Sequence, residues 1–141
     1  RVLAARAASR LSAGACVVVS IGTAITVDVV SRSGAFEGGA IIPGPNLWLD
    51  ALSRTALLPR TVFRTCVRIP ARDTLTALQA GARYGIPSAI DRLISEQMPS
   101  HGAPVFLTGG WSRVFSRLLA HRTTVRPNLV LEGIGILLEE L

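Results

Sequence analysis

The sequence predicts an α/β fold built on a mixed five-stranded sheet with helices on both faces. Three apolar segments joined by tight turns, residues 16–20, 24–30 and 35–42, predict an antiparallel meander. Two shorter apolar segments, 105–107 and 123–125, each follow a helical stretch, as parallel strands do. The 141 residues are 49% hydrophobic, and their glycines and prolines are dispersed, which suits one globular domain.

Helical patterns fill the remaining segments. Residues 2–11 are rich in Ala and Leu, and residues 47–55 follow Asn46, which we expect to cap them before the chain turns at 56–59. Asp73 is expected to cap a long helix with apolar positions at helical spacing. We expect Gly85 and Pro87 to bend or divide that helix. Two further helices are predicted over residues 111–120 and 129–141.

The uncharged segment 11–27 follows three arginines and resembles a signal peptide or a membrane helix. It is slightly short for a membrane span, and it contains Gly14, Gly22 and several hydroxyl residues. Its β-branched centre favours a strand, and the unbroken apolar run at residues 16–20 predicts a strand covered on both faces. We therefore expect a cytoplasmic protein with no membrane partner.

The net charge and the two cysteines do not indicate a specific function. The net charge is +6 with no lysine, but the arginines are spread singly and are not interleaved with aromatic residues, so we expect no nucleic-acid partner. Cys16 and Cys66 have no metal-binding spacing and are expected to be buried small hydrophobic residues in a reducing compartment.

Four short motifs could carry chemistry. The segment 20–28 ends a strand at Gly22-Thr23, where backbone N–H groups and a hydroxyl can approach a phosphate. The segment 38–44 places two glycines in a strand, which indicates a bulge or a close backbone approach. The segment 108–110 is a strand followed by Gly-Gly and a helix, where a nucleotide can lie against amides. Each motif alone is more often plain structure than a ligand site.

The fourth motif, Asp73-Thr74, leaves the Thr74 hydroxyl at a helix start. No Ser-His-Asp arrangement is predicted, because His101 and His121 have no neighbouring acids in the sequence. The three glutamates of the last helix are expected to be solvated.

Taken in order, these motifs resemble those of the type III pantothenate kinases. That family carries D-x-G-T-A-x-T-x-D, then G-G-x-I-x-P-G, T-A-L-L-P, an N-T or D-T helix start, and T-G-G. The corresponding segments here are 20–28, 38–44, 55–59, 73–74 and 108–110. The resemblance covers essentially the whole chain. It implies the actin-like ATPase fold (ASKHA, ribonuclease H-like), and it implies that residues 1–141 are the C-terminal domain, without the N-terminal one.

The resemblance also implies residue roles. Gly22, Thr23, Gly109 and Gly110 would bind ATP, and Arg1 and Thr74 would bind pantothenate. Ser20 stands where the family has an aspartate that holds a monovalent cation, and a hydroxyl is a weaker cation ligand than a carboxylate. No catalytic residue is predicted within the chain, because the aspartate general base of the family's G-x-D-R motif would lie just before Arg1.

The implied reaction is phosphorylation of pantothenate by ATP with Mg²⁺ and K⁺ or NH₄⁺, the first step toward coenzyme A, in a homodimer. We expect this chain alone to be inactive. Three alternatives stay open: a non-catalytic regulatory relative of the Bvg accessory factor kind, another actin-like member such as a sugar kinase, and an α/β domain that binds no nucleotide.

Overall fold

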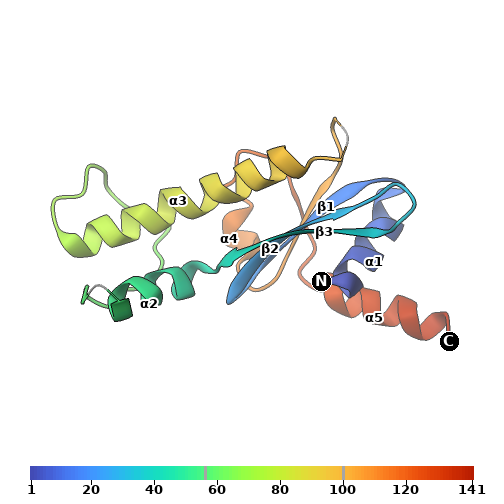
Figure 1. The fold of residues 1–141 in the computed structure, drawn as a ribbon, viewed down its shortest axis with the longest axis horizontal. Coiled ribbons are helices and arrows are strands. Elements are labelled where there is room, and N and C mark those ends of the chain that lie inside the picture. The colour runs from blue at the N-terminus through green and yellow to red at the C-terminus, as the bar shows by residue number, and fades with distance from the viewer. Residues whose placement is uncertain (56, 100) are drawn as a thin grey trace.

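The computed structural model describes residues 1–55, 57–99 and 101–141 as a five-stranded sheet between two layers of helices (Figure 1). The strands are β1 (Cys16–Ile21), β2 (Ala24–Val30), β3 (Phe36–Pro43), β4 (Val105–Thr108) and β5 (Thr124–Val125). Their order across the sheet is β3-β2-β1-β4-β5. β1, β2 and β3 are antiparallel neighbours, whereas β4 and β5 add in parallel. The predicted mixed sheet is therefore confirmed.

β1 lies at the centre of the sheet and is buried on both faces, as its unbroken apolar sequence predicts. Its odd-numbered residues, Val17, Val19 and Ile21, face the larger core, and Cys16 and Val18 face the smaller one. Adjacent residues of β1 therefore belong to different layers, as the two-residue repeat of a strand requires.

The larger core is covered by α2 (Pro45–Thr55), α3 (Thr74–Gln97) and α4 (Ser112–Phe115). α3 contributes four fully buried residues at helical spacing, Ala82, Ile86, Ile90 and Ile94. α3 is one uninterrupted helix through Pro87, so of the two effects expected of Gly85 and Pro87, bending or division, division does not occur. α2 and α3 lie side by side and extend beyond the sheet as an arm (Figure 1).

The smaller core lies beneath α1 (Val2–Ser12) and α5 (Leu129–Glu139), which pack against each other (Figure 1). The buried face of α1 is made of alanines. A Cβ on Gly133 would lie 2.0 Å from the Leu3 carbonyl oxygen, so glycine is required for this close approach. Arg6 and Arg10 both donate to Glu140, and Arg126 pairs with Glu132, so these glutamates are not simply solvated as expected.

Two helix predictions need correction. The helix predicted over residues 111–120 is only the four-residue α4, followed by turns. The backbone N–H groups of Ala120 and His121 donate to the Asp91 carboxylate instead of continuing a helix. α2 begins at Pro45, so Asn46 lies within its first turn and does not precede it as a cap. The predicted turn at 56–59 begins on residue 56, outside the described residues.

Asp73 caps α3 as predicted: its carboxylate accepts the Thr76 N–H at 2.8 Å. Cys16 is buried, but Cys66 is exposed, so only one of the two cysteines is the small core residue that we expected. Within the parts of the chain that the structure describes, no helix is long and apolar enough to cross a membrane.

Candidate phosphate-binding site

The tip of the β1–β2 hairpin is Gly22-Thr23, as the sequence predicts. The Gly22 N–H donates to the carbonyl of Ala24 at 3.0 Å, which closes the turn. Thr23 is exposed, and its carbonyl accepts the N–H of Gly44 at 2.8 Å. The hairpin tip is therefore joined to the residue that follows β3.

Gly44 occupies a position that no other residue can fill without rearrangement. A Cβ there would lie 2.0 Å from the Gly22 carbonyl oxygen and 2.5 Å from that of Thr23. The carbonyl of Gly44 in turn accepts the Trp48 N–H, the first bond of α2. Pro45 at the first helical position needs no donor there and has the right backbone angle for a helix start. The start of α2 is thus held against the hairpin tip.

The Gly109-Gly110 turn closes the other side of the hairpin. Gly109 has φ +89°, and a Cβ on it would lie 2.5 Å from the Ile21 carbonyl oxygen. That oxygen accepts the Trp111 N–H at 3.2 Å. Among the described residues, nothing lies within 4 Å of the Cβ position of Gly110, so this second glycine borders open space.

These three segments meet at a hollow of about 180 Å³ lined by Gly22, Thr23, Asn46, Leu47, Asp50 and Trp111. A hairpin glycine, a threonine hydroxyl and the positive end of the α2 dipole suit an anion. Pockets for whole small ligands measure roughly 300–1,000 Å³, so this hollow has the size of a phosphate group and not of a nucleotide.

Asp50 was not predicted as a site residue. It lies one helical turn after Asn46, so both lie on the face of α2 that borders the hollow. A carboxylate beside a phosphate is repulsive unless a cation lies between them. The four-residue spacing of Asn46 and Asp50 indicates that they share one face of α2. Only the contact between Gly44 and the hairpin shows that this face borders the hollow.

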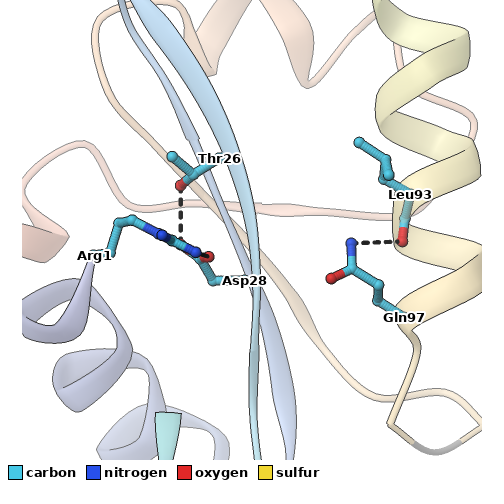
Figure 2. A network of polar contacts seen from close by, with 5 residues as sticks. All are labelled: Arg1, Thr26, Asp28, Leu93 and Gln97. Atoms are coloured by element: carbon cyan, nitrogen blue, oxygen red, sulfur yellow. Dashed lines mark hydrogen bonds and ion pairs between the residues drawn. The ribbon is translucent and has the colours of Figure 1, made fainter. Parts of the chain in front are cut away.

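Arg1 forms an ion pair with Asp28 on the opposite face of the sheet (Figure 2). Arg1 Nη2 and Nε donate to Asp28 Oδ1 at 2.6 and 3.0 Å, and the Thr26 hydroxyl donates to Oδ2 at 2.9 Å. The Asp28 side chain is 2% exposed, and this hydrogen bonding raises the pKa of the Arg1 guanidinium. Gly39 leaves room for the carboxylate, because a Cβ there would lie 2.6 Å from Oδ1.

Ser20, the predicted cation ligand, is half-buried on β1 between Thr26 of β2 and Thr108 of β4. The strand alternation places it on the same face as Asp28. Both oxygens of that carboxylate already accept from Arg1. Among the residues that the structure describes, no group of three or more His, Cys, Asp or Glu side chains could hold a metal ion.

Thr74 lies exposed in the first turn of α3. The start of α3 and the N-terminus lie far apart (Figure 1), so the chain does not bring Thr74 and Arg1 together. Of the four residues predicted to bind ATP, Gly22 and Thr23 line the hollow, whereas Gly109 packs against Ile21 next to them and is followed by Gly110. Ser20 and Arg1 lie toward its α1–α5 face.

The family model for type III pantothenate kinase matches residues 1–96. The chain belongs to the type III pantothenate kinase family. It is 37% identical over 130 residues to the type III pantothenate kinase of Azoarcus sp. (strain BH72), covering 92% of this chain and 49% of that protein. It is 41% identical over 126 residues to that of Alkalilimnicola ehrlichii, and the match covers 87% of this chain and 50% of that protein. The chain thus spans about half the length of these type III pantothenate kinases.

The narrower prediction, that the chain is the C-terminal half of the type III pantothenate kinase architecture, does not fit these matches. It depended on placing the family's G-x-D-R motif across the start of the chain, and the chain holds only an arginine that could belong to that motif. The predicted family is confirmed, and this part of the prediction is not.

Solved structures confirm the actin-like fold. A conserved putative Baf family transcriptional activator from Campylobacter jejuni has a TM-score of 0.69 at 27% identity, covering 97% of this chain and 63% of that one. The activator of the 2-hydroxyisocaproyl-CoA dehydratase from Clostridium difficile has a TM-score of 0.58 at 12% identity. The match covers 99% of this chain and 68% of that one. At that low identity the second match bears on the fold alone.

Proposed function

We propose that this chain supplies phosphate-binding elements of a type III pantothenate kinase, which transfers the γ-phosphoryl group of ATP to the hydroxyl of pantothenate. The supporting observation is the hollow where the hairpin tip, the start of α2 and the Gly109-Gly110 turn meet. Family membership supplies the substrate class. Coenzyme A synthesis follows from that activity.

In this proposal Thr23 donates its hydroxyl to a phosphate oxygen, and the backbone beside Gly22 allows close approach. Gly110 leaves open space for the rest of the nucleotide. Phosphoryl transfer depends mainly on positioning and on stabilising charge, so a rigid hairpin clamped by Gly44 and Gly109 suits the task.

The residues around the hollow fit Mg²⁺ that arrives with the nucleotide. The Asp50 carboxylate, the Asn46 amide and the Thr23 hydroxyl offer the hard oxygen ligands that Mg²⁺ prefers. Mg²⁺ would supply neutralisation of phosphate charge, which also removes the repulsion between phosphate and Asp50.

The residues around Ser20 do not fit a monovalent cation. They offer hydroxyl groups, while the Asp28 carboxylate is neutralised by Arg1. We therefore assign no role to K⁺ or NH₄⁺ in this chain.

For pantothenate we propose contacts from Arg1 and Thr74 in a homodimer, because one chain keeps these residues apart. A second copy could bring its Thr74 toward the first copy's Arg1. Light scattering at micromolar concentration should give the mass of a dimer, and a monomer under those conditions would count against this arrangement.

Titration calorimetry with ATP and Mg²⁺ tests the nucleotide role. Thr23→Ala should weaken binding by roughly tenfold, the equivalent of one hydrogen bond to a charged group. Thr65→Ala is the matched control, because Thr65 is exposed and does not line the hollow. Equal affinities of both variants and the unmodified chain would reject the hairpin as the phosphate contact.

Kinase activity is measured separately, as the release of ADP from ATP that depends on added pantothenate. We expect no turnover from the 141-residue chain alone, since no residue in it is assigned as the general base. Turnover by the chain alone would show that the base lies within it.

A second candidate function is a regulatory role without catalysis. It is favoured by the 27% identical Campylobacter jejuni structure, described as a putative Baf family transcriptional activator, and by Ser20 in place of the family's aspartate. Ser20→Asp distinguishes the two: a gain of cation-dependent ATP binding favours a kinase that has lost one ligand, and no change favours the regulatory role.

A further inference from the structure

A second polar cluster lies near the opposite end of the sheet, where α3 approaches the turn after α4. His121 Nδ1 lies 2.7 Å from Asp91 Oδ1. The same carboxylate accepts the backbone N–H groups of Ala120 at 2.9 Å and His121 at 3.1 Å. Three hydrogen bonds therefore fix the Asp91 carboxylate and the imidazole relative to each other. The sequence predicts no Ser-His-Asp arrangement because it places no acid near His121, but the fold brings Asp91, 30 residues earlier, against the imidazole.

The hydrogen bonds determine which imidazole nitrogen carries the proton. An ionised carboxylate only accepts hydrogen bonds, so neutral His121 must donate from Nδ1, and its Nε2 then carries a lone pair. Ser95 Oγ lies 3.4 Å from Nε2, on the same helix as Asp91 and one turn later. This is the order of serine, imidazole and carboxylate found where a serine hydroxyl is activated as a nucleophile. Such contacts are often long before a substrate binds.

The cluster borders a pocket of about 770 Å³. Ser95, His121 and Arg122 line it together with apolar residues, among them Met98 and Val105. This volume lies within the range of small-ligand sites and is about four times that of the phosphate-sized hollow. The pocket includes the first residue of β4, whereas the hollow lies beyond the last one, so the two sites are separate.

We propose that Ser95 is a nucleophile that accepts small apolar acyl groups from esters, with His121 as its base and Asp91 as the residue that positions the imidazole. Ser95 Oγ attacks the ester carbonyl carbon, and its proton passes to His121 Nε2. The bond from carbonyl carbon to alkoxy oxygen then breaks, and the alcohol leaves with that proton. Water repeats the sequence on the acyl-serine, which releases the carboxylic acid and restores the hydroxyl. Arg122 offers positive charge for the intermediate oxyanion.

Labelling with a fluorophosphonate probe, followed by mass spectrometry of the modified peptide, tests the proposal on the 141-residue chain. We expect the probe on Ser95, and loss of labelling in Ser95→Ala and in His121→Gln. Ser88→Ala is the matched control, because Ser88 is an exposed serine of the same helix that does not line the pocket. Labelling of Ser88→Ala should equal that of the unmodified chain.

Hydrolysis of p-nitrophenyl acetate gives the second readout. Asp91→Asn should lower kcat by about tenfold or more with little change in KM, because the imidazole loses the partner that fixes its tautomer. Ser95→Ala should reduce hydrolysis to that of free imidazole. Unchanged hydrolysis in Ser95→Ala, or probe found on other residues only, would overturn the proposal. Excess ATP with Mg²⁺ should leave labelling unchanged.

Discussion

The backbone N–H of Gly44 donates to the carbonyl of Thr23 at 2.8 Å, and the same glycine lies so close to the hairpin that a Cβ would meet the Gly22 oxygen at 2.0 Å. One residue thus holds the hairpin tip and begins α2. The required contact is between backbone atoms, so no side-chain adjustment can relieve a substitution there.

Gly44→Ala is therefore expected to lower the free energy of unfolding by about 1–3 kcal/mol, as overpacking does, and to weaken ATP binding by moving the hairpin. Gly110→Ala is the matched control for stability alone, because nothing among the described residues lies within 4 Å of its Cβ position. Urea unfolding of both variants gives the comparison. Similar stability of the two variants would show that the hairpin can move away from residue 44 at little cost in free energy.

Arg1→Ala should leave the buried Asp28 carboxylate without its ionic partner. Removing one member of a buried pair costs about 3–5 kcal/mol, but the Arg1 side chain is 35% exposed, so we expect about 1–2 kcal/mol. Arg92→Ala removes the exposed pair with Glu96 and should cost less than about 0.5 kcal/mol. Thermal unfolding of both variants checks the difference, and equal losses would contradict a structural role for the Arg1–Asp28 pair.

In α5, which packs against α1, two glycine-to-alanine substitutions are expected to change the stability in opposite directions. Gly133→Ala places a methyl group 2.0 Å from the Leu3 carbonyl oxygen and should separate the two helices, at a cost of about 1–3 kcal/mol. Gly135→Ala, two residues along the same helix, has open space and should stabilise the chain by up to about 1 kcal/mol through helix propensity. Destabilisation by both would indicate that the helix itself is strained.

Asp73 links stability to pH. The hydrogen bonds that it accepts from Thr76 lower its pKa below the ordinary value of 3.8. The stabilising contribution is therefore fully present above pH 3.8 and is lost as the pH falls through the lower pKa of the folded state. The stability difference between the unmodified chain and Asp73→Ala should be largest at neutral pH and should shrink below pH 3.8. Urea titrations across this range test it; a difference that does not vary with pH would rule out the cap as its source.

The structure could be predicted from the sequence where the residues in contact are also close together in the chain. The β1–β2–β3 meander follows from apolar runs and tight turns, and the Asp73 cap follows from a contact three residues away. The order of the motifs also identified the family. Three of their glycines, Gly39, Gly44 and Gly109, lie where a Cβ would come within 2.0–2.5 Å of a backbone oxygen.

Long-range polar contacts could not be predicted in this way. Asp28 pairs with Arg1 across 27 residues, and Asp91 reaches His121 across 30. The second contact takes the amides of Ala120 and His121, so the predicted helix does not reach residue 120, while α4 itself ends at Phe115 and is followed by turns. Periodicity describes the faces of an element and does not show which distant carboxylate will compete for its amides.

Because α2 starts at the glycine that holds the hairpin, the hairpin tip and the arm formed by α2 and α3 are mechanically coupled. A ligand that pulls the tip is therefore expected to move the first turn of α2 with it. Occupancy of the phosphate-sized hollow would then shift α2 against α3. A spin label on exposed Cys66 would report that shift, because the carbonyls of its neighbours Thr65 and Val67 accept hydrogen bonds from Arg83 and Tyr84 of α3.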